Sequence, residues 1–143
     1  MIPREEWEWF GIAGHLIVGS DCQFHLTTRV GSALVSTVGE YLPDEGSREI
    51  AARSKGITLE GRGDMRRADF MKKVGWLEIG LDRTYETMVF PLGDEVCQTK
   101  DCNCGMPVVT DWTELDMEGY NSRGDAQRGH YVMCERWAQE SAA

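Results

Sequence analysis

Three cysteines stand close together in the last third of the chain. Cys97, Cys102 and Cys104 form the spacing C-x4-C-x-C, and Gly105 follows at once. Three thiolates this close can point at one ion if the chain curls, and a glycine allows the curl. Without a cation they would repel one another. The pattern predicts a metal site, with Zn²⁺ as the expected ion; an iron–sulfur cluster and free surface thiols are the alternatives.

A fourth metal ligand is expected from the C-terminal helix. His130 and Cys134 are four residues apart, a spacing that places both side chains on one helical face. Cys134 is favoured because it falls on the predicted buried face, and His130 remains the alternative. Four protein ligands would make a closed, structural zinc site, which argues against zinc catalysis. Such a site would staple residues 93–143 together.

A second group of reactive side chains is His15, Cys22 and His25. Cys22 and His25 have C-x2-H spacing, and the functional interpretation is a Cys–His nucleophile pair. They could also form a second metal site, with Asp21 or Glu40 as the fourth ligand. The alternative interpretation is a buried thiol and two hydrogen-bonded histidines, which is the commoner role of such residues.

None of the other sequence motifs indicates a particular catalytic reaction. A basic stretch could meet phosphate or an acidic partner, or be a solvated helix face: it comprises Arg62, Arg66, Arg67, Lys72 and Lys73. The tripeptide RGD at 62–64 is interpreted as coincidence because the chain shows no secretion signal. The sequence contains no dinucleotide fingerprint, phosphate-binding loop, G-x-S-x-G or H-E-x-x-H motif.

Composition and charge narrow the class of protein. The chain has 143 residues, 41% of them hydrophobic, which suits a single domain (1–143) with its own core. Its net charge is −9, and residues 93–143 alone carry ten acidic and four basic groups. This excess opposes direct nucleic-acid binding and favours a basic protein partner, or simply solubility. Five cysteines, no export signal and no long apolar run predict a reducing cytosol and no membrane span.

The hydrophobic pattern predicts an α+β fold of antiparallel hairpins packed with three to four short helices. The clearest signal is a hairpin of residues 24–30 and 33–42 that turns at Gly31-Ser32. A second hairpin is expected from residues 76–80 and 84–92, the latter a central strand. Helices are expected at 3–10, 48–55 (capped by Ser47), 64–74 (capped by Asp64) and 125–139, short strands at 15–19 and 57–61, and an irregular acidic stretch at 110–124.

Several stretches together resemble a group of small tailed-bacteriophage proteins of unassigned function. They are GHLIVGSDCQFHLTTRVGSALVSTVGEYLP, GRGDMRRADFMKKVGWLEIG, YETMVF, CNCGMP and RGHYVMCERWA. The resemblance implies a phage accessory protein in the host bacterial cytoplasm, and it supplies no catalytic residues.

The function expected from these observations is binding rather than catalysis. A zinc-stapled domain would present an acidic surface to a host or phage protein, and such a surface could occupy the basic groove of a host defence or nucleic-acid machine. One alternative is a small enzyme that uses Cys22 with His25 or His15. A virion component is a further alternative. Nothing in the sequence predicts the oligomeric state.

Overall fold

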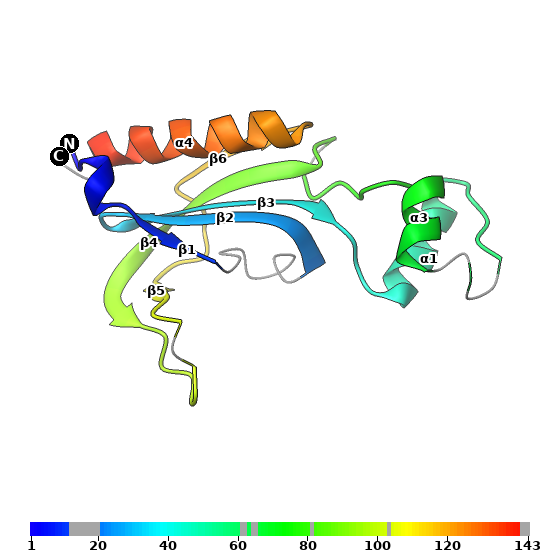
Figure 1. Ribbon diagram of the computed structural model, residues 1–143, viewed down its shortest axis with the longest axis horizontal. Helices are drawn as coiled ribbons and strands as arrows, with labels where there is room; N and C mark the ends of the chain where they lie inside the picture. The colour runs from blue at the N-terminus through cyan, green and yellow to red at the C-terminus, as the bar shows by residue number, and fades with distance from the viewer. Residues whose placement is uncertain (12–20, 61–62, 64–65, 81, 103, 141–143) are drawn as a thin grey trace.

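A six-stranded antiparallel sheet carries one long helix across one of its faces (Figure 1). The computed structural model describes residues 1–11, 21–60, 63, 66–80, 82–102 and 104–140. The strand order is β1-β2-β3-β4-β5, and β6 also pairs with β4. The strands are β1 (Glu8–Phe10), β2 (Cys22–Val30), β3 (Ala33–Tyr41), β4 (Tyr85–Val96), β5 (Pro107–Val109) and β6 (Asp116–Tyr120). The predicted α+β class is confirmed. None of the described helices has the length and apolarity needed to cross a membrane.

The β2–β3 hairpin is the centre of the sheet, and its predicted turn is confirmed. Val30 pairs with Ala33, so Gly31 and Ser32 make the turn. Gly31 has a φ of 59°, in the left-handed region that a two-residue hairpin turn requires and that glycine adopts at little cost.

Strand β4 is the second organising element, and its predicted central position is confirmed. One side of β4 pairs with β3, while the other pairs first with β6 and then with β5. Residues 76–80 do not form the predicted hairpin partner; they make only isolated bridges, Leu77 with Tyr41 and Gly80 with Arg83. The role of partner strand is taken by β6, from the stretch expected to be irregular.

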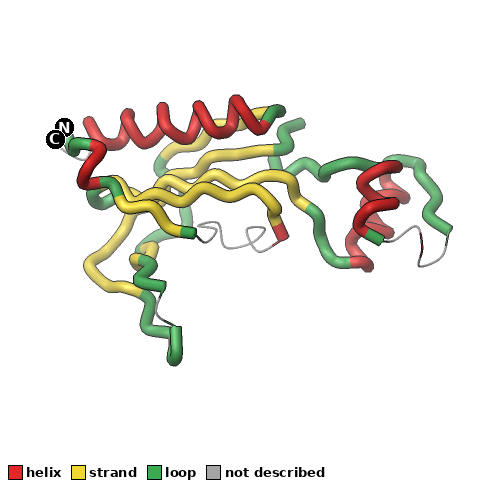
Figure 2. Tube along the Cα trace, in the orientation of Figure 1, coloured by secondary structure: helices red, strands yellow, loops and turns green. Residues whose placement is uncertain are grey.

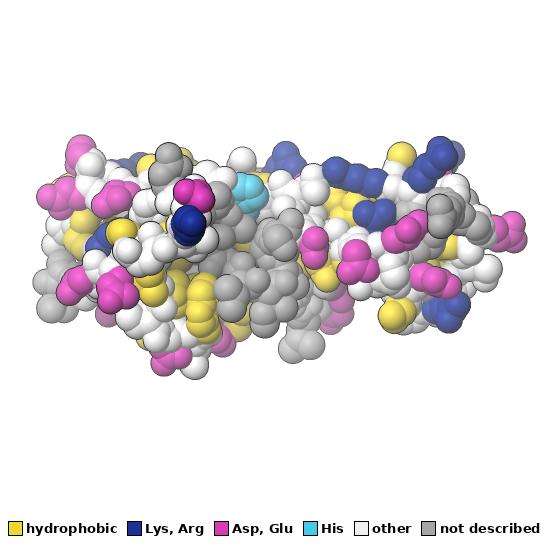
Figure 3. Space-filling view, turned by 90° about the horizontal axis from the view of Figure 1, so that it is seen from below, with side chains coloured by type: hydrophobic (Ala, Val, Ile, Leu, Met, Phe, Trp, Pro, Cys, Tyr) yellow, Lys and Arg dark blue, Asp and Glu magenta, His cyan; other side chains and the backbone are white. Residues whose placement is uncertain are grey.

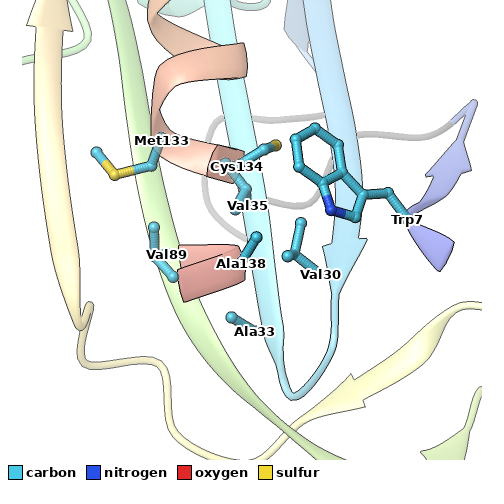
Figure 4. Packing of buried hydrophobic residues seen from close by; sticks show 8 residues of the cluster. All are labelled: Trp7, Val30, Ala33, Val35, Val89, Met133, Cys134 and Ala138. Carbon is cyan, nitrogen blue, oxygen red and sulfur yellow. The ribbon is translucent and has the colours of Figure 1, made fainter. Parts of the chain in front are cut away.

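The main core lies between the sheet and helix α4 (Arg123–Glu140), which confirms the predicted terminal helix (Figure 2). Alternate residues of the strands face α4, so small and branched side chains of the sheet pack against those of the helix. Figure 4 shows eight of them: Trp7, Val30, Ala33, Val35, Val89, Met133, Cys134 and Ala138. At one point the helix approaches β6 very closely, since a Cβ on Gly129 would lie 2.2 Å from the Tyr120 ring.

Helices α1 (Glu45–Ser54) and α3 (Arg67–Lys73) lie together beyond one end of the sheet (Figure 1). They share a smaller apolar cluster built around Leu42, Phe70 and Leu77. We call residues 42–80 the helical lobe. Helix α1 begins earlier than predicted because Asp44, and not Ser47, is its N-cap: the Asp44 carboxylate accepts a hydrogen bond from the Ser47 amide at 2.9 Å.

Tertiary contacts override local propensity at the N-terminus. The helix predicted for residues 3–10 is wrong: a single 3₁₀ turn, η1 (Arg4–Glu6), is followed by β1. Trp7 is buried against the main core, and β1 pairs with β2, which an uninterrupted helix would prevent. Residues 57–60 form no strand. The strand predicted at 15–19 and the Asp64 cap lie outside the described residues, and α3 begins at Arg67.

Candidate metal centre

The three clustered cysteines occupy the loop that joins β4 to β5. Val96 pairs with Pro107 at the ends of these strands, and the Cys97 amide donates a hydrogen bond to the Met106 carbonyl at 2.7 Å. Residues 97–102 and 104–106 therefore lie in a closed loop at the tip of a hairpin. In Figure 1 this loop projects from the side of the sheet opposite α4. We call it the cysteine loop.

Local turns inside the cysteine loop bring the sulfurs together. The Cys102 amide donates to the Thr99 carbonyl at 3.0 Å, and both Asp101 and Gly105 have positive φ, at 63° and 67°. As a result the sulfurs of Cys97, Cys102 and Cys104 all lie within 4.8 Å of one another. Zinc–sulfur bonds of about 2.3 Å in a tetrahedral site separate sulfurs by about 3.8 Å. A small inward movement is enough, and the three cysteines could hold a metal ion, as the sequence predicts.

Hydrogen bonds already favour a thiolate at one of the three positions. Hydrogen bonds from Thr99 first, and then from Cys104 and Cys102, lower the pKa of Cys97 to about 7. The Met106 amide, whose nitrogen lies 3.5 Å from the Cys104 sulfur, acts to lower the pKa of Cys104. The hydrogen bond with Cys102 and partial burial outweigh it, so the pKa of Cys104 is raised. The thiolate is the form that binds a metal, so the lowered pKa of Cys97 favours metal binding there.

The structure does not bring His130 or Cys134 to the cysteine loop. Both lie on α4 and face the sheet, on the side opposite the loop (Figure 1). Both ring nitrogens of His130 are engaged, Nε2 with Thr28 Oγ1 at 2.8 Å and Nδ1 with Thr37 Oγ1 at 2.6 Å. Cys134 belongs to the main core. The predicted shared, buried face of His130 and Cys134 is present, and it packs against the sheet.

Cys22 and His25 are not brought together either. Both lie on β2, and residues three apart on a strand point to opposite faces. Burial, followed by the nearby carboxylates of Asp21 and Glu86, raises the pKa of Cys22 to about 12, so the thiol stays protonated and is a poor nucleophile. His15 lies outside the described residues. Among the described residues, nothing pairs with the buried Nδ1 of His25.

Glu40, considered as a possible ligand beside Cys22, is already engaged elsewhere. Its carboxylate accepts hydrogen bonds from the Arg123 guanidinium at 2.5 and 2.7 Å and from the Tyr85 hydroxyl at 2.7 Å. Hydrogen bonds from Arg123 and Tyr85 outweigh the opposing effect of burial, so the pKa of Glu40 is lowered. A carboxylate held in this way is a structural partner of α4.

Sequence reasoning missed a set of exposed apolar side chains in the segment that contains the cysteine loop. Seven carboxylates and one lysine fall between residues 93 and 118. The same segment exposes five large apolar side chains: Val96, Val108, Trp112, Leu115 and Met117. We call these five, with the carboxylates of Asp94, Glu95, Asp101, Asp111 and Glu114, the acidic–apolar surface. Its sequence signal is the set of apolar residues interspersed among the carboxylates, a pattern that includes the predicted irregular stretch 110–124.

Part of the acidic–apolar surface lies on the sheet face that α4 leaves uncovered. Trp112 packs on Phe90, with ring centroids 5.0 Å apart, and Met117 pairs with Met88. Phe90 and Met88 point away from α4, because Val89 between them belongs to the main core. Figure 3 views the molecule from this side and shows hydrophobic and acidic side chains intermingled there.

Two surface pockets in the described part of the chain lie away from the cysteine loop. One is lined by α1 and residues 56–59 in the helical lobe, and the other by residues near the two chain ends, including Trp7 and Glu135. No family model matches this chain, and no curated protein or solved structure matches it. Fold and site together define an α+β protein with a three-cysteine candidate metal centre on a surface hairpin.

Proposed function

We propose that this protein is a non-catalytic binding protein that engages a basic protein partner through the acidic–apolar surface. The observation that carries the proposal is the exposure of Trp112, Leu115 and Met117, at 44%, 50% and 48%, among carboxylates. Large apolar side chains left in water together are typical of interaction sites. Tryptophan and methionine are enriched at interfaces, and a surrounding field of one sign steers an oppositely charged partner.

The metal in this proposal is Zn²⁺, and its role is structural. Thiolates are ligands that zinc prefers, and the cysteine loop offers three of them. The loop connects Val96 directly to the strand that contains Val108, so fixing the loop fixes both of these exposed side chains. Zinc would thereby order one edge of the acidic–apolar surface before a partner arrives, which lowers the entropy cost of binding.

The biological setting proposed is that of a bacteriophage accessory protein in the cytoplasm of its bacterial host. The support is the sequence resemblance and the absence of long apolar helices among the described residues. The partner would be a host or phage protein, and an acidic surface suits a basic groove made for nucleic acid. Catalysis by Cys22 is not proposed, because its thiol is buried and His25 points to the other face.

The test is a comparison of partner binding by two surface variants. The variant W112A/M117A removes two side chains of the acidic–apolar surface, and I50A removes a more exposed apolar side chain (69%) on α1, far from that surface. The partner is captured from host lysate, purified, and titrated by calorimetry at low and high salt. Loss of an interface anchor costs about 2 kcal/mol, so W112A/M117A should bind about 30-fold more weakly, and I50A as wild type.

Two results would contradict the proposal. One is an affinity that W112A/M117A does not reduce, or that salt does not weaken. The other is a C22A variant that binds the partner normally and yet loses the biological effect, which would favour the enzyme alternative.

A further inference from the structure

We infer that the metal of the cysteine loop has three ligands from this chain and takes its fourth, a neutral imidazole nitrogen, from another molecule. The inference rests on the zinc centre proposed above and deepens it. It concerns an open coordination position that faces solvent and accepts a histidine of the partner.

The described part of the chain offers no fourth donor beside the three sulfurs. Within it, the group of cysteine, histidine and carboxylate atoms that lie within 4.8 Å of one another contains only Cys97, Cys102 and Cys104. The two remaining cysteines are buried in the sheet and its core, and His130 uses both ring nitrogens on threonines. Zinc completes a tetrahedron, so the fourth position is open to water or to a ligand from outside this set, which can displace that water.

The centre is accessible to a ligand from another molecule. Cys102 is exposed, and Cys97 and Cys104 are partly exposed. The cysteine loop projects beyond the sheet (Figure 1), and no helix of the described chain packs over it. Val96 and Val108 of the acidic–apolar surface lie at the base of the loop, so a partner docked over these two side chains would bring a ligand within reach of the metal.

Charge selects imidazole over a fourth thiolate or a carboxylate. Three thiolates on Zn²⁺ leave the centre with one net negative charge, and a fourth anionic ligand would leave two. The surrounding segment already holds seven carboxylates against a single lysine, Lys100. In such a field a neutral ligand adds no repulsion, and histidine is the neutral side chain that zinc prefers.

The same charge argues against a second copy of this chain as the source. Two copies that met at the metal would bring together two acidic segments of the same sign, which costs free energy at short range. A basic partner carries the complementary charge and relieves the repulsion. The occupant of the open position is therefore a histidine in a basic segment of the proposed partner.

The experiment uses the purified chain loaded with Co²⁺, whose visible spectrum reports its ligands. We expect one Co²⁺ per chain with sulfur-to-metal absorption typical of three thiolates. C102S should lose the metal, and C22S and C134S should retain it. Imidazole should then shift the visible bands saturably. A histidine-containing basic peptide should do so at a concentration at least about tenfold lower than an acidic peptide with the same histidine.

Each other outcome points to a different failure. A spectrum with four-thiolate intensity that imidazole leaves unchanged overturns the open position. So does a spectrum altered by H15A or H25A before any imidazole is added, because the chain would then supply the ligand itself. Dimers that form on metal addition would make a second copy the source. No metal binding at all refutes the zinc centre, while the partner-binding proposal still stands or falls with W112A/M117A.

Discussion

His130 is the residue whose role the structure changes most. It is fully buried on α4, with its ring nitrogens on the hydroxyls of Thr28 and Thr37. Thr37 also meets Thr87 at 2.6 Å, so a short polar chain crosses the interface of helix and sheet. A neutral imidazole has one donor and one acceptor and satisfies both contacts. His130 therefore fixes the register of α4 on the sheet and needs no metal to explain its burial.

This environment makes stability depend on pH. Burial lowers the pKa of His130 to about 4, whereas the unfolded chain has the ordinary value of 6.5. As the pH falls below 6.5, His130 is protonated in the unfolded state but stays neutral in the folded state. The free energy of unfolding should therefore fall by about 1.4 kcal/mol per pH unit until pH 4. Urea unfolding at stepwise pH measures this slope. H130Q, which cannot titrate, should flatten it.

Two carboxyl groups, those of Glu40 and Asp116, lose their contribution to the free energy of unfolding at a lower pH than His130 does. The pKa values of Glu40 and Asp116 are lowered by hydrogen bonds from arginines and their neighbours, against the effect of burial. Their stabilisation is present above the unfolded values of 4.5 and 3.8 and is lost below them. The range between 6.5 and 4.5 therefore separates His130 from these two carboxyls. An equal slope in H130Q and wild type there would refute the assignment.

At the scale of the element, the N-terminal end of α4 is anchored by a buried carboxylate. Glu40 has a positive φ of 56°, uncommon for a residue with a side chain, and follows Gly39, the last β3 residue that pairs with β4. Its carboxylate is held by Arg123 at the first turn of α4 and by the Tyr85 hydroxyl of β4. The ion pair thereby connects β3, β4 and α4 at one point.

Removing the Arg123 side chain should lower the free energy of unfolding far more than removing that of a neighbouring arginine. R123A leaves Glu40 buried with only the Tyr85 hydroxyl, which should cost about 2 kcal/mol of unfolding free energy. R128A is the matched control. Arg128 pairs with Asp125 on the same helix, but both side chains are exposed, so the expected loss is at most about 0.5 kcal/mol. Urea denaturation measures the free energy of unfolding of the two variants. Equal decreases in R123A and R128A would contradict the anchoring role of Arg123.

Elements with a strong local pattern were predictable, and elements fixed by partners were not. The β2–β3 hairpin follows from alternating residues around Gly31-Ser32, and α4 from its helical spacing. Strand β6 exists because β4 offers it an edge, a contact distant in sequence. The candidate metal centre divides in the same way. Its three cysteines were evident because one short loop holds them, whereas the place of Cys134 depended on which surface α4 covers.

At the scale of the molecule, most of the basic residues and the net negative charge are concentrated in different parts of the chain. The helical lobe has its own apolar cluster and carries most of the basic residues, while the acidic excess lies around the cysteine loop. Figure 3 shows lysines and arginines together with acidic side chains over the lobe, so the two signs nearly balance there. The two chain ends meet at the other end of the sheet, where the Ile2 amide donates to the Ala138 carbonyl at 3.1 Å and Arg4 pairs with Glu135. The cysteine loop is therefore a projection from an already closed core.

Removal of the metal should consequently have a local effect. From sequence alone, a staple between the loop and the terminal helix predicts that chelation loosens the whole C-terminal third. In the structure α4 is held instead by Met133, Cys134 and Ala138 in the main core, which the metal does not touch. Hydrogen exchange of the zinc-loaded protein, with and without a chelator, should therefore accelerate at residues 97–106 by at least about tenfold, equivalent to about 1.4 kcal/mol.

Amides of α4 and of the β2–β3 hairpin should keep their protection in the same experiment, because their opening requires the main core to separate. C102S without chelator should reproduce the chelated pattern, and C134S should not, since its sulfur lies in the core and away from the loop. C134S is expected to lower global stability instead, as a hydroxyl placed in an apolar core does. If chelation exposed α4 together with residues 97–106, the metal would have to be tied to the helix after all, and the three-ligand centre would be wrong.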